Sequence, residues 1–296
     1  MSVKSAVIEI NQLCRRYGAQ DAVHNLDLTV EPGKCYGLFG RNGAGKTTTI
    51  KCLLNLLRPT AGSVRVFGRD PARDENAVKS RLAYVPDAVA FYPWMTTLEA
   101  LHYQASFRDR WNRQTEQELL SQFRLNPTQR VSGLSKGQKT QLALIGAVCA
   151  EPELLVLDEP TSGLDPIVRR EFIQTVIGAY QDADPGKRTI LVSTHLISEF
   201  EGLIDDFTIM DQGRAVLALG ADEARSKFQK IRARFSQAPP ALAGVEPRRV
   251  RRDGREIEII VNGDAESVLE RVKAAGPETV SSESLTLEEI FVAALQ

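Results

Sequence analysis

Apolar residues recur along this chain with two spacings, which predict short strands that alternate with helices. Alternation of apolar and polar positions over Val7–Ile10 and Leu26–Val30 predicts strands with one covered face. Largely apolar runs predict buried strands at Cys35–Phe39, Leu82–Val85, Leu154–Leu157 and Thr189–Thr194. Apolar residues at helical spacing predict helices at 46–57, 134–148 and 167–180. We therefore expect an α/β fold.

A glycine-rich segment joins the strand Cys35–Phe39 to the helix that follows it. Its sequence, Gly40-Arg41-Asn42-Gly43-Ala44-Gly45-Lys46-Thr47, matches the phosphate-binding loop G-x-x-x-x-G-K-[ST]. The glycines allow backbone N–H groups to turn inward onto an anion, and the helix N-terminus adds partial positive charge. Lys46 is expected to reach the β and γ phosphates of a nucleotide, and the Thr47 hydroxyl to bind Mg²⁺. The alternative, a turn that binds nothing, is disfavoured by the complete octapeptide.

Two carboxylates, Asp158 and Glu159, directly follow the apolar strand Leu154–Leu157. Ligands of α/β sheets bind at the carboxyl ends of strands, so we expect Asp158 to hold Mg²⁺ and Glu159 to accept a proton from an attacking water. A solvated acidic turn is the alternative. His195 ends the strand Thr189–Thr194 at the same edge. It is a candidate sensor of the γ phosphate, although a lone histidine is more often a surface residue.

Three further positions carry weaker signals. Tyr17 could stack on a nucleotide base or simply pack. Asp87 follows the strand Leu82–Val85 and Pro86, which exposes it. The sequence Leu134-Ser135-Lys136-Gly137-Gln138 opens a helix, and such a start is either an ordinary N-cap or a second anion-binding end.

Length and composition allow two domains and give little global charge. The 296 residues include 37 basic and 38 acidic side chains, so the net charge of -1 favours neither nucleic acid nor an anionic membrane. The four cysteines lack metal-ligand spacing and are expected to be reduced. The longest apolar run, 142–150, is too short to cross a bilayer, and no signal-peptide pattern opens the chain. We expect a soluble polypeptide.

Over about residues 4–220, the order and spacing of these motifs resemble the nucleotide-binding domain of the ATP-binding cassette (ABC) family. The matching segments are the phosphate loop 40–47, the signature 134–138, the acidic motif 154–159, the loop 162–165 and the switch His195. The resemblance implies a P-loop NTPase fold with a mixed sheet, an antiparallel β subdomain and a helical subdomain at about 91–150. It implies ATP and Mg²⁺ as ligands, phosphate-loop contacts that extend to Thr48, and adenine stacking on Tyr17.

The resemblance also implies that two such domains pair head to tail. Ser135 and Gly137 would then contact a γ phosphate bound by the partner, ATP binding would hold the pair together, and hydrolysis would release it. The family usually has Gln at the position of Asp87, which could still bind Mg²⁺ directly or through water. It usually has Gly at the position of Lys136, where Lys adds a cation and adopts positive φ less easily. Both departures from the family pattern put the expected rate of ATP hydrolysis in question.

After Gly220 the pattern changes to a helix at 221–228, a strand at 257–261, a helix at 265–275 and a capped final helix at 284–291. We expect a small α+β accessory domain at 221–296, which resembles the domain that follows the cassette in bacterial ABC-2 type and multidrug exporter ATPases. The cluster Arg248, Arg249, Arg251 and Arg252 could contact lipid or RNA, but a solvated hairpin edge is favoured.

These features predict the ATPase subunit of an ABC transporter, of the ABC-2 exporter kind, at the cytoplasmic side of the membrane. Its expected partners are a second copy or a related ATPase and a separate membrane permease, and no nucleic acid is expected. The aromatic segment Phe91–Tyr103 is a candidate permease surface, with core packing as the alternative. Rival interpretations are a soluble ABC ATPase acting on ribosomes or DNA, and a regulatory cassette with little hydrolysis. A phosphotransferase is the weakest alternative.

Overall fold

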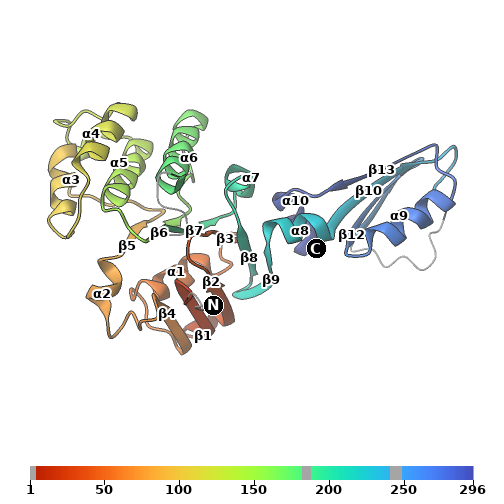
Figure 1. Ribbon diagram of the computed structural model, residues 1–296, viewed down its shortest axis with the longest axis horizontal. Coiled ribbons are helices and arrows are strands. Elements are labelled where there is room, and N and C mark those ends of the chain that lie inside the picture. Colours follow the sequence, from red (N-terminus) through yellow and green to blue (C-terminus); the bar gives the residue numbers. More distant parts are fainter. Residues whose placement is uncertain (1–4, 182–187, 241–248, 296) are drawn as a thin grey trace. The chain divides into compact units, whose positions relative to one another are not determined.

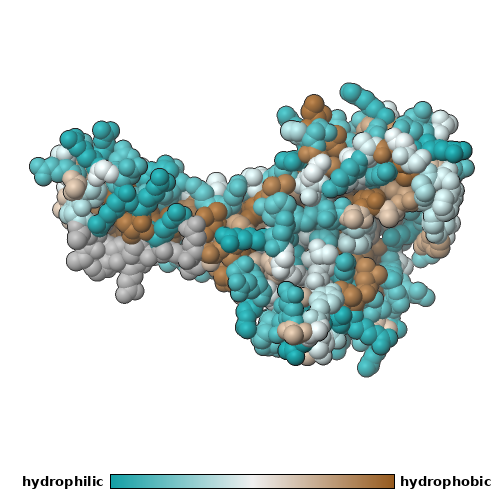
Figure 2. All heavy atoms as spheres, turned by 180° about the vertical axis from the view of Figure 1, so that it is seen from behind, coloured by the Kyte–Doolittle hydropathy of each residue, from teal (hydrophilic) through white to brown (hydrophobic). Residues whose placement is uncertain are grey.

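The computed structural model describes residues 5–181, 188–240 and 249–295. It divides into two compact units (Figure 1). The first comprises Met1–His195 with Met210–Ala215, and the second comprises Leu196–Ile209 with Val216–Gln296. On the face that Figure 2 presents, hydrophobic atoms occur in small groups among hydrophilic ones.

An antiparallel sheet with the strand order β2-β1-β4 forms part of the first unit. Its strands are β1 (Ile8–Tyr17), β2 (Gln20–Val30) and β4 (Ala61–Val66). Ile8 pairs with Val30 on one side and with Val66 on the other, and all three side chains are fully buried. The alternating pattern thus predicted the covered face correctly, while β1 and β2 extend further than the pattern showed.

A six-stranded sheet with the order β5-β6-β7-β3-β8-β9 carries the phosphate loop and the acids. Its strands are β3 (Cys35–Gly40), β5 (Leu82–Val85), β6 (Leu154–Asp158), β7 (Thr189–Thr194), β8 (Asp206–Asp211) and β9 (Arg214–Gly220). β3, β7, β6 and β5 run parallel. The carboxyl ends of these strands therefore share one edge of the sheet, as expected.

The first unit also contains helices. They are α1 (Lys46–Leu53), α2 (Glu75–Lys79), α3 (Thr97–Ala105), α4 (Arg113–Gln122), α5 (Lys136–Cys149) and α6 (Pro166–Gln181), with a 3₁₀ turn at Val131–Gly133. The expected helix 46–57 ends at Leu53, because Asn55 takes a positive φ of 56° that an α-helix cannot continue through. In Figure 1, α3, α4 and α5 lie together as a helical group.

The aromatic residues near α3 are exposed. Tyr92, Trp94, Tyr103 and Phe107 are 44%, 64%, 42% and 69% exposed. They contact one another in series, with ring centroids 4.8 Å apart for Tyr92–Trp94, 5.5 Å for Tyr92–Tyr103 and 5.1 Å for Tyr103–Phe107. Core packing is therefore the wrong interpretation of these rings, which form a surface array.

The second unit is built on an antiparallel sheet with the order β11-β12-β10-β13. Its elements are α7 (Ile197–Phe200), α8 (Ala221–Lys227), β10 (Phe228–Arg234), β11 (Arg249–Asp253), β12 (Glu256–Asn262), α9 (Ala265–Ala274), β13 (Thr279–Ser284) and α10 (Leu287–Ala294). Ile231, Ile257 and Ile259 form a core with Val272 of α9. The second unit therefore has the α+β structure that the sequence predicted.

Only β12 among these four strands was predicted from the sequence, because the others alternate with charged residues or carry few apolar ones. β11 lies at the edge of the sheet and all its residues are exposed. Its arginines Arg249, Arg251 and Arg252 therefore lie on a solvated hairpin edge, as favoured above. Arg248 lies outside the described residues.

Candidate nucleotide-binding site

The phosphate loop connects β3 to α1 and contains two left-handed glycines. Gly43 has a φ of +84° and Gly45 a φ of +104°. A Cβ atom added at Gly45 would lie 2.5 Å from the carbonyl oxygen of Ala22 on β2, and one at Gly40 would lie 2.7 Å from that of Met210. The tight loop therefore requires glycine for space at Gly40 and for both space and φ at Gly45.

Lys46 lies at the first position of α1, and its side chain is 5% exposed. Its ammonium group donates to the carbonyl oxygens of Gly40 at 2.7 Å and Arg41 at 3.2 Å. It also lies 2.9 Å from Oε1 of Glu159. The loop backbone and one carboxylate thus hold this cation where the helix N-terminus begins, the position that the motif predicts for a phosphate ligand.

Asp158 ends β6 and is 1% exposed. Its Oδ1 accepts hydrogen bonds from the hydroxyls of Thr47, at 3.1 Å, and Ser193, and the Tyr84 hydroxyl lies 3.5 Å from Oδ2. Burial raises the pKa of Asp158, the hydrogen bonds from Ser193 and Thr47 oppose that rise, and the charges of Glu159 and Asp87 add to it. Burial, with the nearby Asp158 charge, also raises the pKa of Tyr84.

These groups fit a Mg²⁺ ion. A hydroxyl and a carboxylate are the hard oxygen donors that Mg²⁺ prefers, and a carboxylate whose ionised form is disfavoured by burial gains from a neighbouring cation. Within the described parts of the chain, no cluster of three or more His, Cys, Asp or Glu residues is arranged to hold a metal. Mg²⁺ commonly uses only one or two carboxylates and completes its shell with phosphate and water.

Glu159 follows β6 in a left-handed conformation with a φ of +47°, which is uncommon for a residue other than glycine. Its N–H donates to the carbonyl oxygen of Ser193 at 2.9 Å. Its side chain is 10% exposed and lies between two groups, with Oε1 at 2.9 Å from Lys46 Nζ and Oε2 at 2.8 Å from His195 Nδ1. The His195 ring is 35% exposed. Lys46 and His195, two of the residues that the sequence marked as candidates, therefore both contact Glu159.

A cavity of about 410 Å³ opens in front of the loop. Its lining residues are Gln20, Asp21, Ala22, Asn42, Gly43, Ala44, Gly45, Lys46, Thr47, Thr48, Asp87, Glu159 and Gln212. The expected phosphate-loop residues from Asn42 onward, Asp87 and Glu159 thus meet in one place. Tyr17, which is 46% exposed, pairs in register with Gln20 at the rim, and the guanidinium carbon of Arg15 lies 4.7 Å from its ring centroid.

The sequence missed several of these neighbours. Tyr84 and Ser193 contact Asp158, and each is the last residue but one of a strand that pairs with β6, so the register of the parallel sheet would have identified them. Gln20, Asp21 and Gln212 line the cavity from β2 and from the turn between β8 and β9, and no local pattern marks them.

The signature residues lie at the start of α5, away from this lining. Ser135 is the N-cap: its hydroxyl accepts from the N–H of Gln138 at 3.2 Å, and Gln138 Oε1 accepts from the N–H of Ser135 at 3.0 Å. Leu134 is buried, whereas Ser135 and Lys136 are exposed. Neither Lys136 nor Gly137 has a positive φ, because both are in the first turn of the helix. Lys136 therefore does not carry the strain of a positive φ that the comparison with glycine had suggested.

No helix in residues 5–181, 188–240 or 249–295 is long and apolar enough to cross a membrane.

Comparisons with known proteins agree with this geometry. The family model described as ABC transporter matches residues 23–162. The bacitracin transport ATP-binding protein BcrA of Bacillus licheniformis is 34% identical over 228 residues, which are 76% of this chain and 74% of BcrA. The daunorubicin resistance ATP-binding protein DrrA3 of Streptomyces coeruleorubidus is 35% identical over 221 residues, or 72% of this chain and 68% of that protein.

The dimeric structure of the bacterial ABC transporter cassette MJ0796 shares the fold, with a TM-score of 0.63 and 21% identity over 72% of this chain and 98% of that one. The residues that the family model matches include both the phosphate loop and the acidic motif, and the geometry above brings these two together. The chain therefore belongs to the ABC transporter family, as an ATP-binding subunit with ATPase activity.

Proposed function

We propose that ATP binds with its phosphates in the loop cavity and that Glu159 is the general base for its hydrolysis. The observation that carries this assignment is the Glu159 carboxylate, whose side chain is 10% exposed and lies between Lys46 and His195. A base must lie beside the water that attacks the γ phosphate, and Lys46 and His195 are the groups suited to hold that phosphate. Lys46 would neutralise charge that develops on the phosphate oxygens, and His195 would orient them.

The remaining cavity residues would bind and orient the nucleotide. The N–H groups of the loop from Gly40 to Thr48 would surround the phosphates, and adenine would stack on the exposed ring of Tyr17 beside the cavity rim. Thr47, Asp158 and Asp87 would hold Mg²⁺, which when bound neutralises charge on the β and γ phosphates.

We also propose that two copies, or this chain and a related ATPase, pair head to tail. The exposed start of α5 is not part of the cavity lining of its own chain, and Ser135 and Gly137 would there contact the γ phosphate bound by the partner. The cassette MJ0796, which shares the fold, is dimeric, and this supports the pairing of two such domains. Lys136 would add a positive charge at the same end of the helix.

We propose further that the chain works with a separately encoded membrane permease as an ABC-2 type exporter, at the cytoplasmic side of the membrane. The names of BcrA and DrrA3 refer to bacitracin transport and daunorubicin resistance, which support an export role. The exposed array of Tyr92, Trp94, Tyr103 and Phe107 is the surface proposed for a cytoplasmic helix of that permease. A cavity of about 730 Å³, lined in part by Phe107 and Leu56, adjoins it.

The test is affinity purification of the tagged full-length chain from membranes with MgATP, as wild type and as Glu159→Gln. We expect a polytopic membrane protein to copurify, and hydrolysis by Glu159→Gln to fall about 100-fold or more while ATP still binds. Glu153→Gln is the control, because Glu153 precedes the same strand and pairs with Arg81 away from the cavity.

Two results would contradict the proposal, each in a separate part. A normal rate in Glu159→Gln would remove the base assignment. Recovery of ribosomal or DNA-bound partners alone would remove the permease arrangement and favour a cassette that acts on those assemblies.

A further inference from the structure

A short helix follows His195 directly in the chain. This helix, α7, spans Ile197–Phe200, and its two end residues are each 1% exposed. Glu201 is its C-cap residue and has a side chain that is 21% exposed. The chain thus passes from His195, the last residue of this stretch of the first unit, directly into α7 and Glu201 of the second unit.

Glu201 connects α7 to two other helices of that unit. Its Oε1 accepts the N–H of Leu287, the first residue of α10, at 2.9 Å. Arg225 of α8 donates to the Glu201 carbonyl oxygen at 3.3 Å and lies 3.7 Å from the carboxylate. The first N–H groups of a helix have no partner within the helix, so a carboxylate that accepts one of them is both hydrogen-bonded and attracted by the helix dipole. Glu201 thus ties the end of α7 to the start of α10.

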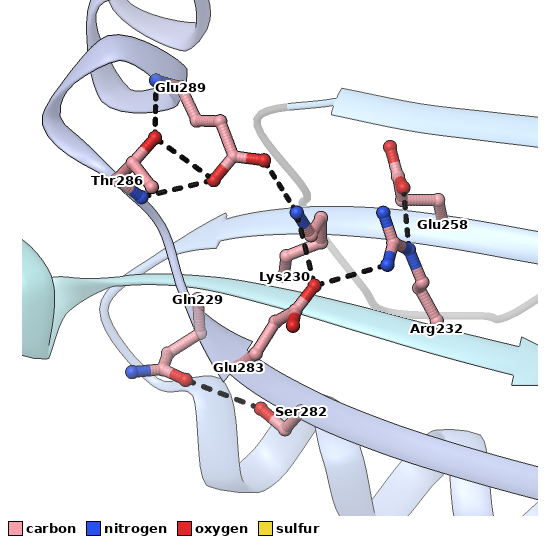
Figure 3. Close-up of polar contacts among 8 residues, drawn as sticks. All are labelled: Gln229, Lys230, Arg232, Glu258, Ser282, Glu283, Thr286 and Glu289. Carbon is pink, nitrogen blue, oxygen red and sulfur yellow. Dashed lines mark hydrogen bonds and ion pairs between the residues drawn. The ribbon is translucent and has the colours of Figure 1, made fainter. Parts of the chain in front are cut away.

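α10 is in turn fixed to the sheet by a series of charges (Figure 3). Glu289, in its first turn, lies 2.6 Å from the ammonium group of Lys230 on β10. The Lys230 side chain is 9% exposed and lies 3.1 Å from Glu283 on β13. Glu283 also pairs with Arg232 at 3.2 Å, and Arg232 pairs with Glu258 of β12 at 2.9 Å. The start of α10 is therefore a fixed point of the second unit.

We propose that Glu201 is a positioning residue for ATP hydrolysis, which holds the segment that begins at His195 by tying α7 to the anchored start of α10. This inference rests on the proposed role of His195 in orienting the γ phosphate. Glu201 does not contact the nucleotide in this scheme. It acts through the chain that joins it to His195, and the C-terminal elements thereby take part in setting the rate of hydrolysis.

The test compares Glu201→Ala with wild type in the full-length chain, by kcat and KM for MgATP and by the affinity for a fluorescent ATP analogue. We expect kcat to fall about tenfold or more, as for a displaced orienting group, with KM and nucleotide affinity unchanged. Glu201→Gln should recover part of kcat, because its amide oxygen can still accept the N–H of Leu287. Glu223→Ala is the control, since Glu223 pairs with the exposed Lys227 in α8.

A second pair of variants changes the donor instead of the acceptor. Leu287→Pro and Leu287→Ala both remove the buried leucine side chain, but only proline removes the N–H. Proline is tolerated at the first position of a helix, and the preceding Thr286 has φ −67° and ψ 159°, which suits a residue before proline. We expect kcat to be lower for Leu287→Pro than for Leu287→Ala. Equal values would contradict the proposal.

Combination with His195→Ala separates this inference from the proposed function. If Glu201 acts through His195, adding Glu201→Ala to His195→Ala causes no further loss of kcat. A full additional tenfold loss, or a wild-type rate in Glu201→Ala, overturns the positioning role while the role of His195 stands. A wild-type rate in His195→Ala would instead overturn the proposed function of that histidine.

Discussion

Gly43 and Gly45 provide a matched test of how tightly the phosphate loop is built. Both have positive φ, so alanine at either position carries the cost of a left-handed conformation, about 1–2 kcal/mol. Their surroundings differ. A Cβ at Gly43 meets no atom within 4 Å, whereas one at Gly45 lies 2.5 Å from the Ala22 carbonyl oxygen and 3.3 Å from the Met210 side chain.

The expected costs follow from that difference. Forcing a methyl group into a close-packed site typically costs a further 1–3 kcal/mol, through displacement of the backbone it meets. We therefore expect Gly43→Ala to lower the free energy of unfolding by about 1–2 kcal/mol, and Gly45→Ala by about 2–5 kcal/mol. The affinity for ATP should fall more in Gly45→Ala, because relief of the clash moves the loop N–H groups away from the phosphates.

Urea denaturation followed by tryptophan fluorescence measures these costs. Both tryptophans of the chain, Trp94 and Trp111, lie in the first unit, so their signal reports the unit that contains the loop. Equal destabilisation by the two variants would refute the reasoning, since it would show that the approach of the loop to β2 is not rigid. A fluorescent ATP analogue provides the parallel measurement of affinity.

Three further predictions concern buried charge and the aromatic array. Because burial raises the pKa of Asp158 above its ordinary 3.8, the folded state holds that proton longer than the unfolded state, and its contribution to stability is lost as pH rises through the raised pKa. The urea midpoint of wild type relative to Asp158→Asn should therefore fall as the pH is raised above the ordinary pKa of 3.8, and level off once the folded-state carboxyl has ionised. Lys230→Met removes a largely buried ammonium group from its pairs with Glu283 and Glu289 and should destabilise the second unit by about 1–3 kcal/mol, against about 0–1 for the exposed Lys227→Met, as measured by hydrogen exchange in β10. Trp94→Ser, at an exposed ring, should change stability by less than about 0.5 kcal/mol yet reduce the membrane protein recovered by affinity purification.

The sequence predicted those parts of the site that have a local signature. The phosphate loop, Asp158–Glu159 and His195 each follow a buried strand at a fixed spacing, so the pattern identifies both the residue and its edge of the sheet. Contacts between distant segments leave no such pattern. The bond from Leu287 to Glu201 joins residues 86 positions apart. It depends on how α7 and α10 pack, which composition and periodicity do not determine.

The sequence also did not predict the backbone conformation at several individual residues. A positive φ at Asn55 ends α1 before the apolar pattern ends, and an ordinary helical φ at Lys136 removes the strain expected there. Glu159 shows the opposite case, since nothing in the order Leu157-Asp158-Glu159-Pro160 indicates a left-handed glutamate. Its conformation is held by the bond from its N–H to Ser193 on the neighbouring strand.

The left-handed turn at Glu159 has a direct consequence for the proposed mechanism. Successive residues of an extended strand point to opposite faces, so Asp158 and Glu159 would diverge if β6 simply continued. With the turn, Asp158 bonds to Thr47 while Glu159 pairs with Lys46, and both carboxylates lie against the start of α1. A γ phosphate bound by Lys46 would compete with Glu159 Oε1 for the same ammonium group. On the proposed roles, binding of the nucleotide therefore frees Oε1 to accept a proton, while the contact of His195 Nδ1 with Glu159 Oε2 keeps the carboxylate in place.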